Sequence, residues 1–307
     1  MNESQHSPIR TLVVVDDNRL GGCPRRIFHP QGEPLMQVSD EILKCVAFLS
    51  CLTAAGQEDR GTAFFVSQTF PGGQPGEGVL FAVTAKHVID KAKSKGTDGK
   101  VYFRLNRKDG NAEYVAIPVT DWVKHPKTSA DVAIATIDLD FLVYDHLSIP
   151  QKMFVSDPQE TAHGIGPGSD LFFPGLFVRH KGTKSNIPII RTGTIAAMPI
   201  EPIETDQGTV RAYLAEARSI GGLSGSPVFT HLGLNYTTPI HFLGLVKSHY
   251  DIEDCLDVSK QINMGIALVV PDDDILELLN SDVFDPARKA AQDESAERRR
   301  KLLPKDD

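Results

Sequence analysis

The sequence predicts an all-β protein made of two antiparallel six-stranded β-barrels and a C-terminal helix. Short runs of apolar or alternating residues recur between residues 40 and 270, and segments rich in Gly and Pro separate them. This rhythm is typical of antiparallel sandwiches and barrels. The runs form two sets of about six, one on each side of a connection marked by Pro and Gly at 150–168. A clear helical pattern occurs only near the end of the chain.

The first barrel is predicted within residues 39–150. Residues 1–38 precede it as an N-terminal arm, because they contain four Pro and three Gly and show no sustained helical period. The first set of strands is expected at 42–52, 62–67, 79–84, 101–105, 114–119 and 131–137. Cys45 and Cys51 are six positions apart and share one face of the first strand, which indicates core packing.

The second barrel is predicted within residues 151–270, and residues 271–307 form a helix and a charged tail. The second set of strands is expected at 171–178, 188–197, 210–217, 227–230, 241–246 and 264–270. Three Asp at 272–274 suit the first turn of a helix because carboxylates favour the positive end of its dipole. The tail from 285 is interpreted as a solvated helix or a frayed end. A docking segment is the alternative.

Composition restricts the possible partners. The chain of 307 residues has 32 Lys and Arg against 40 Asp and Glu, a formal charge of −8. We therefore expect no nucleic-acid partner, since no chain-wide basic surface exists to neutralise phosphates. No apolar stretch is long enough to span a membrane, and the N-terminus lacks the features of a signal peptide. The four cysteines show no metal or disulfide spacing. A reduced, cytoplasmic protein without membrane contact is the expectation.

Three short strings carry the chemistry. The first, Phe81-Ala-Val-Thr-Ala-Lys-His87, is an apolar strand that leads into a histidine. The second places Asp131 at the head of an apolar run. The third surrounds Ser224 with glycines, in Gly221-Gly-Leu-Ser224-Gly-Ser-Pro-Val-Phe. Each string alone has a structural explanation: a histidine after a strand, a turn carboxylate, a tight bend. Together they supply a nucleophile, a base for its proton and an acid that orients the base.

The three strings resemble those of the chymotrypsin/trypsin-like serine peptidases, in the bacterial form without disulfides. The matching elements are Thr84-Ala-Lys-His87, Asp131-Val-Ala-Ile and Gly222-Leu-Ser224-Gly-Ser-Pro, in the family's order and at similar separations. The string that begins at Ser224 resembles glutamyl endopeptidases in particular. The resemblance covers roughly residues 40 to 280. It implies the two-barrel fold, peptide or protein substrates, and no cofactor or metal.

The resemblance also implies roles for single residues. His87 would be the general base, Asp131 its orienting acid and Ser224 the nucleophile. The main-chain N–H groups of Gly222 and Ser224 would form the oxyanion hole. A peptide substrate would add as a β-strand along 243–249, where Ser248 takes the family position that hydrogen-bonds the acid.

Specificity and activation involve further positions. Arg218, six positions before Ser224, corresponds to the floor of the substrate pocket, and Ser219 is expected beside it. A guanidinium there would select acidic side chains, although Arg218 pairing with an acid elsewhere on the protein is the alternative. Leu223 stands where family members activated by a new N-terminus carry an acid, so this activation is not expected. Lys86 stands where the family usually has a small residue. We expect its ammonium to point to solvent; the alternative is that it points toward His87.

Two alternatives to a peptidase remain open. The first is a catalytically silent protease-like scaffold that binds a protein partner. Such a scaffold would have the same sequence motifs if its oxyanion turn were misassembled. An esterase is disfavoured because its Gly-x-Ser-x-Gly elbow belongs to an alternating α/β chain. No metal site is expected. The chain has neither HExxH nor CxxC, and four histidines considered as ligands are scattered, at His163, His180, His241 and His249.

Overall fold

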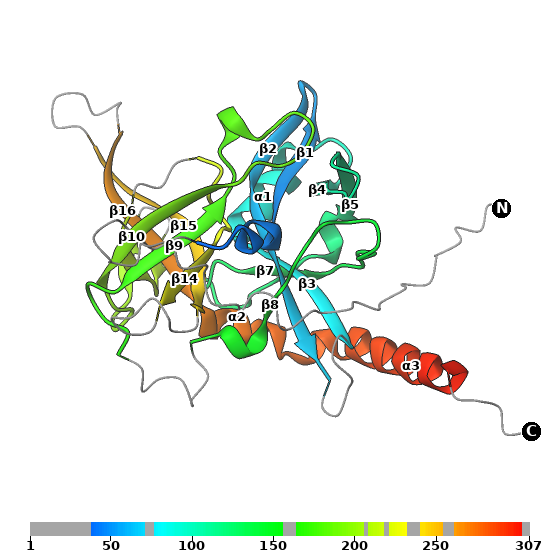
Figure 1. Ribbon diagram of the computed structural model, residues 1–307. Coiled ribbons are helices and arrows are strands. Elements are labelled where there is room, and N and C mark those ends of the chain that lie inside the picture. Colours follow the sequence, from blue (N-terminus) through cyan, green and yellow to red (C-terminus); the bar gives the residue numbers. More distant parts are fainter. Residues whose placement is uncertain are drawn as a thin grey trace, which may run out of the picture.

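The computed structural model describes residues 38–70, 77–155, 164–205, 208–217, 221–231, 240–253 and 261–302. The N-terminal arm predicted for 1–38 therefore lies outside the described residues, except for its last residue. Figure 1 shows two β-rich halves side by side, with a long C-terminal helix along the lower edge. In the described part, no helix is long and apolar enough to cross a membrane.

The N-terminal half is an eight-stranded sheet whose strands lie close to the predicted runs. Its strand order is β5-β4-β1-β2-β3-β7-β6, and β8 pairs with β2. The strands are β1 (Val46–Thr53), β2 (Gly56–Thr69), β3 (Gly78–Thr84), β4 (Lys100–Asn106), β5 (Ala112–Pro118), β6 (Val123–Lys124), β7 (Ala133–Thr136) and β8 (Ile149–Pro150). Its helices are η1 (Asp40–Cys45), α1 (Lys86–Lys95), η2 (Val119–Asp121) and η3 (Gln151–Met153).

The N-terminal sheet does not show the closed six-stranded barrel that the sequence predicts. Its path ends at β5 on one side and at β6 on the other, and these two strands do not pair with each other. Strand β6 has only two residues, and most of β5 is partly or fully exposed. Neither edge therefore offers a long, buried ladder that could close the sheet. The region predicted as the first strand also begins as a 3₁₀ helix, η1.

The C-terminal half is a closed six-stranded barrel, as predicted. The barrel order is β10-β13-β16-β15-β14-β9, and β11 and β12 form a separate hairpin. The strands are β9 (Asp170–Gly175), β10 (Ile189–Ala197), β11 (Ile203–Thr205), β12 (Gly208–Val210), β13 (Tyr213–Glu216), β14 (Pro227–His231), β15 (Ile240–Glu253) and β16 (Gln261–Pro271). The helices of this half are η4 (Val178–His180), α2 (Asp272–Leu279), η5 (Asp282–Phe284) and α3 (Asp285–Leu302).

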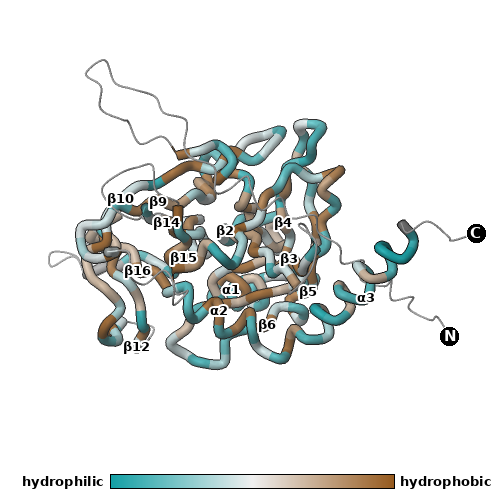
Figure 2. Tube along the Cα trace, turned by 60° about the horizontal axis from the view of Figure 1, so that its bottom comes forward, coloured by the Kyte–Doolittle hydropathy of each residue, from teal (hydrophilic) through white to brown (hydrophobic). Residues whose placement is uncertain are grey.

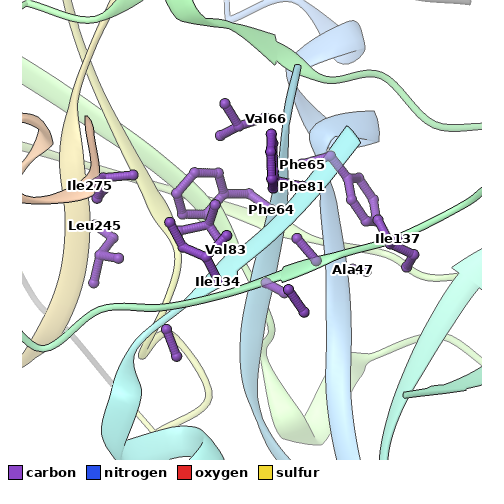
Figure 3. Packing of buried hydrophobic residues seen from close by; sticks show 14 of the residues in the cluster. Ala47, Phe64, Phe65, Val66, Phe81, Val83, Ile134, Ile137, Leu245 and Ile275 are labelled. Carbon is purple, nitrogen blue, oxygen red and sulfur yellow. The ribbon is translucent and has the colours of Figure 1, made fainter. Parts of the chain in front are cut away.

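One hydrophobic core joins the two halves. Phe64 on β2 and Phe242 on β15 have ring centroids 5.3 Å apart, and the cluster around them includes Leu245 on β15 and Ile275 on α2. Figure 3 shows Leu245 and Ile275 facing Phe64 and Val83 across the junction. Each half contributes strands of the candidate site. The shared core therefore fixes these strands relative to each other.

Helix α1 is absent from the sequence prediction. Its buried residues Val88, Ile89 and Ala92 follow a helical spacing, which is a signal the sequence does contain. The usual start signal is missing, because the N-cap residue is Ala85, whose side chain makes no capping hydrogen bond. The first turn obtains its acceptor from Asp131, which is distant in sequence.

The charged tail is a helix for most of its length. Figure 2 shows α3 as a largely hydrophilic tube that leaves the body of the protein. Its start is fixed by Phe284, whose ring packs edge-on against Phe81 with centroids 5.1 Å apart. Pairs such as Arg298 with Glu294 lie along its surface. Ala291 and Ser295 are nevertheless fully buried, so the helix is not solvated on all sides.

Two cysteines, Cys45 and Cys51, are free and fully buried. Burial raises the pKa of the Cys45 thiol well above its ordinary value. Cys45 lies in η1 and Cys51 in β1, so they do not share one strand, but both pack in the core. Cys23 and Cys255 lie outside the described residues.

Candidate active site

His87 and Asp131 are brought together by the pairing of β3 with β7. In this antiparallel ladder Thr84 is opposite Ala133, so the residues after Thr84 and those before Ala133 meet at one end of the sheet. His87 lies in the first turn of α1, three residues beyond Thr84. Asp131 lies two residues before Ala133. The register therefore juxtaposes two side chains that are 44 positions apart in sequence.

Asp131 binds His87 through both carboxylate oxygens. Oδ2 lies 2.7 Å from His87 Nδ1, and Oδ1 accepts a hydrogen bond of 2.9 Å from the main-chain N–H of His87. The carbonyl of Asp131 also accepts the N–H of Lys86, at 3.2 Å. When Nδ1 of the neutral ring carries the hydrogen and donates it to Asp131, the other ring nitrogen, Nε2, has a free lone pair. The same contacts satisfy N–H groups at the start of α1.

The site keeps Asp131 ionised. The side chain of Asp131 is 8% exposed and that of His87 is 21% exposed. Burial by itself would raise the pKa of Asp131, but the hydrogen bonds and charge of His87, with a smaller contribution from the ammonium of Lys247, lower it overall. A carboxylate fixed in this way can orient an imidazole and stabilise its protonated form.

The turn that carries Ser224 is fixed against the same part of the sheet. Gly225 donates its N–H to the carbonyl of Val246 on β15, at 2.8 Å, and Val246 donates to the carbonyl of Ser226, at 2.9 Å. On the other side, the N–H of Thr62 on β2 donates to the carbonyl of Ser224, at 2.9 Å. The hydroxyl of Thr62 donates to the carbonyl of Gly222, at 2.8 Å. The turn is thus bonded to both halves of the protein.

Two glycines allow this close approach. Gly225 has φ of +84°, and a Cβ there would overlap the carbonyl of Thr62 and the hydroxyl of Thr84. Gly61 on β2 faces the turn, and a Cβ there would lie 2.8 Å from the carbonyl oxygen of Ser224 and 3.0 Å from Val88. Ser224 is therefore held beside the end of β3 and the start of α1, where His87 lies.

Gly222 and Ser224 present main-chain N–H groups at this turn. Gly222 has φ of +103°, which L side chains rarely adopt, and a Cβ would lie 2.8 Å from the carbonyl oxygen of Leu176. Among the described residues, neither N–H donates to a main-chain carbonyl. Within the described part, both donors are thus free of main-chain acceptors, which is a property required of an oxyanion hole.

The Ser224 hydroxyl makes no hydrogen bond within the described residues, to His87 or to any other group. The candidate nucleophile and the candidate base are therefore not hydrogen-bonded to each other in this structure. In serine-type sites this bond commonly tightens only when substrate is bound.

Leu223 contributes to the turn in a way that the sequence does not reveal. Its side chain is fully buried in the barrel core together with Val228 and Leu243. A Cβ on Gly175 would come within 2.7 Å of its methyl group, which shows how closely β9 approaches. The turn is therefore anchored by hydrophobic packing at Leu223.

The remaining predicted residues are placed differently. Ser248 on β15 is half-buried and makes no hydrogen bond to Asp131; the neighbouring Lys247 is the β15 residue whose charge acts on Asp131. Lys86 is half-exposed, and its charge acts on His125. Arg218 and Ser219 lie outside the described residues.

One group in the described part could be considered for a metal ion: His125, Asp274 and Glu277, whose ligand atoms lie within 4.8 Å of one another. However, Nδ1 of His125 accepts the N–H of Lys127, at 3.1 Å, so Nε2 keeps the hydrogen of the neutral ring. Glu277 is already paired with the ammonium of Lys127. This arrangement is that of a hydrogen-bonded ion-pair network.

Comparisons with known proteins relate the fold to proteases. No family model and no curated protein matches the chain. Among solved structures, the MamO protease domain from Magnetospirillum magneticum, in its apo form, matches with a TM-score of 0.50 and 12% identity, covering 79% of this chain and 99% of that one. At this identity the match concerns the fold alone.

Two other solved structures are similar at lower scores. The first is an inactive form of the Rv3671c protease of M. tuberculosis, with a TM-score of 0.42 and 16% identity, covering 77% of this chain and 87% of that one. The second is catalytically inactive tobacco etch virus protease complexed with substrate, with a TM-score of 0.43 and 13% identity, covering 80% of this chain and 86% of that one.

Proposed function

We propose that this protein is a serine endopeptidase in which Ser224, His87 and Asp131 act together. The observation that carries the proposal is the double contact of Asp131 with His87, at the strand end against which the glycine-rich turn of Ser224 is bonded. A structural histidine does not require a buried carboxylate on Nδ1 with Nε2 left free. The protease fold of the chain agrees with this proposal.

The proposed reaction begins with the peptide carbonyl beside Ser224. Nε2 of His87 removes the hydroxyl proton while Oγ bonds to the carbonyl carbon. The carbonyl oxygen becomes an oxyanion, which the N–H groups of Gly222 and Ser224 stabilise; one such donor typically contributes about a hundredfold to a thousandfold in rate. His87 then gives the proton to the leaving amine as the C–N bond breaks, and an acyl-enzyme remains. Water, activated by His87, hydrolyses this ester.

The edge of β15 is suited to bind the substrate backbone. Pairing of β15 with β14 ends at Leu245, whereas its pairing with β16 continues past Ser248 to Glu253. The first part of the predicted substrate edge 243–249, up to residue 246, is thus bonded on both sides and is not an edge. From residue 247 onward, β15 has a strand partner on one side only among the described residues. A peptide can add there as an extra strand next to Ser224, so that main-chain hydrogen bonds supply affinity.

A preference for acidic side chains is part of this proposal. Arg218 lies six positions before Ser224, at the position that the family resemblance assigns to the pocket floor. Its guanidinium would pair with a carboxylate and repel Lys and Arg. The glutamyl-endopeptidase-like string Ser224-Gly-Ser-Pro points to the same preference.

A silent scaffold that binds a protein partner is the second candidate. The observation that favours it is the absence of a hydrogen bond from the Ser224 hydroxyl to His87. Such a scaffold would use the open edge of β15 for binding without hydrolysis.

Labelling with a fluorophosphonate separates the two candidates. This reagent phosphonylates a serine that is activated by its base. We expect the full-length protein to be labelled and to cleave a casein or peptide-library substrate, and Ser224→Ala to lose both. The matched control is Ser226→Ala, two residues away. Peptide binding without labelling or cleavage would contradict the peptidase and support the scaffold.

A further inference from the structure

A buried lysine lies close enough to Asp131 for its charge to act on that carboxylate. Lys247 on β15 is 5% exposed, and among the described residues it makes no hydrogen bond and no ion pair within 4.0 Å. Lysines are almost never this buried without a partner. Burial lowers the pKa of Lys247, and the nearby charge of Asp131 opposes this change. The feature is therefore costly, and it lies at the candidate site.

A β-bulge places this lysine. In the ladder between β15 and β16, Val246 is opposite Val269 and Ser248 is opposite Leu268, so Lys247 is the additional residue on β15. A bulge redirects the side chain of the extra residue, and bulges are common next to active sites. Val246, the preceding residue, carries both hydrogen bonds to the Ser224 turn. The lysine is thus fixed to the same segment as the nucleophile.

Lys247 influences Asp131 by charge and without direct contact. Both oxygens of Asp131 are occupied by His87. The ammonium of Lys247 nevertheless contributes to lowering the pKa of Asp131. A positive charge at this place disfavours a second positive charge on the imidazole of His87, because the carboxylate that would stabilise an imidazolium already interacts with an ammonium.

We propose that Lys247 is a positioning residue that keeps His87 neutral, and Asp131 ionised, at mildly acidic pH. The inference rests on the proposed function, since a neutral His87 matters for the reaction only if His87 is its base. Its consequence is that the protein stays active at a lower pH than it would without this lysine.

Other charged groups surround the pair and do not replace Lys247. On α1, Lys86 is half-exposed and acts on His125. His125 lies in the segment between β6 and β7. Burial lowers its pKa, which favours the neutral ring. Lys127 in that segment is paired with Glu277 of α2. Of the other acids on α2, Asp273 is paired with Arg211, and burial raises the pKa of Asp274.

The pH profile of kcat/KM tests this role. In Lys247→Met, the protonated ring of His87 is more stable than in wild type, so the acid limb of the pH profile should move to higher pH. Coulomb's law at an effective dielectric constant near 20 gives a shift of about one pH unit. The ratio of Lys247→Met activity to wild-type activity should then fall up to about tenfold between pH 8 and pH values below the limb. Lys247→Arg keeps the charge and should keep the limb in place. The matched control, Lys124→Met, removes a half-buried lysine that is paired with Asp90, and it should not move the limb.

The resting protein provides a readout that needs no activity. Titration of the His87 ring by NMR in Ser224→Ala should show proton uptake at higher pH once Lys247 is also replaced by Met. This separates failure of the inference from failure of the proposed function. If fluorophosphonate never labels the wild-type protein, the proposed peptidase function is wrong. The NMR titration still measures the effect of Lys247 on His87 in that case.

Coupling between two charges is reciprocal, so Asp131→Asn should lower the pH at which the Lys247 side chain titrates. This measurement decides the matter if Lys247→Met does not fold. An acid limb and a His87 titration that stay unchanged in a folded Lys247→Met would overturn the proposal, as would an unchanged Lys247 titration in Asp131→Asn.

Discussion

Asp131 accepts two hydrogen bonds from one residue, His87: one from the ring at 2.7 Å and one from the main chain at 2.9 Å. The first contact orients the imidazole, and the second satisfies an N–H group at the start of α1. A single carboxylate thereby links the geometry of the proposed base to the helix on which that base lies. Changes at this residue should affect both the chemistry and the way stability depends on pH.

Ser224→Ala and His87→Ala should each abolish peptide hydrolysis, and the double variant should be scarcely worse than either. The residues act as one unit, so removal of one leaves the other without a function. The measurement is kcat/KM on a cleavable peptide for the two single variants and the double variant. Losses that multiply would indicate that the two residues act independently and would contradict the assignment.

Asp131→Asn should lose activity by about ten-thousandfold, as expected when the orienting acid is replaced by an amide. The Asn amide can donate to Nδ1, which favours the tautomer with its hydrogen on Nε2, and Nε2 then cannot accept the serine proton. Folding should be retained, because the remaining side-chain oxygen can still accept the main-chain N–H of His87.

The same variant should also change how stability depends on pH. The pKa of Asp131 is lower in the folded protein than the ordinary value near 3.9. Its contribution to the free energy of unfolding is therefore complete above pH ~4 and is lost as pH falls through the folded pKa. The stability difference between wild type and Asp131→Asn, measured by urea unfolding, should shrink from pH 7 to pH 3. A constant difference would refute this.

Leu223→Ala should destabilise the protein by about 2–5 kcal/mol, the usual cost of removing a fully buried leucine side chain. It should also reduce fluorophosphonate labelling, because the turn loses its anchor. Leu223→Met, which keeps the volume, is the control and should retain most of both properties. Thermal unfolding and labelling rate are the two measurements.

A related expectation concerns residues 1–38. The hydrophobic anchor at Leu223 makes a new N-terminus unnecessary for arranging the turn. The full-length chain should thus react with fluorophosphonate as fast as a chain trimmed within this region. An inert full-length chain and a reactive trimmed one would show that the arm is inhibitory.

Arg218→Ala should remove a preference for acidic residues before the scissile bond. The comparison uses peptide libraries scored with wild type and with the variant. Arg211→Ala provides a control, since Arg211 pairs with Asp273 on the surface. An unchanged profile in Arg218→Ala would exclude this residue from the pocket.

Arg104→Met should destabilise the protein by about 2–4 kcal/mol, because hydrogen bonds from a charged donor are lost and their acceptors are left unsatisfied. Arg104 on β4 is 5% exposed and donates to the carbonyls of Lys181 and Thr183 and to the side chain of Asn186. It thereby fastens the segment before β10 to the N-terminal sheet.

The surface residue Arg107 is the control for this experiment. Arg107 is partly exposed and pairs with Asp109 and Glu113. Exposed ion pairs contribute little, so Arg107→Met should cost less than about 1 kcal/mol. Equal losses in urea unfolding for the two variants would contradict the role assigned to Arg104.

The sequence by itself determined the features that depend on neighbouring residues. Alternating and apolar runs located most of the strands, the acids at 272–274 marked the start of α2, and the glycines around Ser224 indicated a turn with unusual backbone angles. It also gave His87, Asp131 and Ser224 as candidates. These signals are readable because strand period, capping and glycine conformation are local properties of the chain.

Only the tertiary structure decided what depends on pairing between distant segments. The register of β3 with β7 brings Asp131 onto His87 and supplies the start of α1 with a cap that its own sequence lacks. The bulge at Lys247 places a charge beside Asp131, and short or exposed edge strands leave the N-terminal sheet unclosed. Register, bulges and sheet closure arise from contacts across many residues, so no local pattern encodes them.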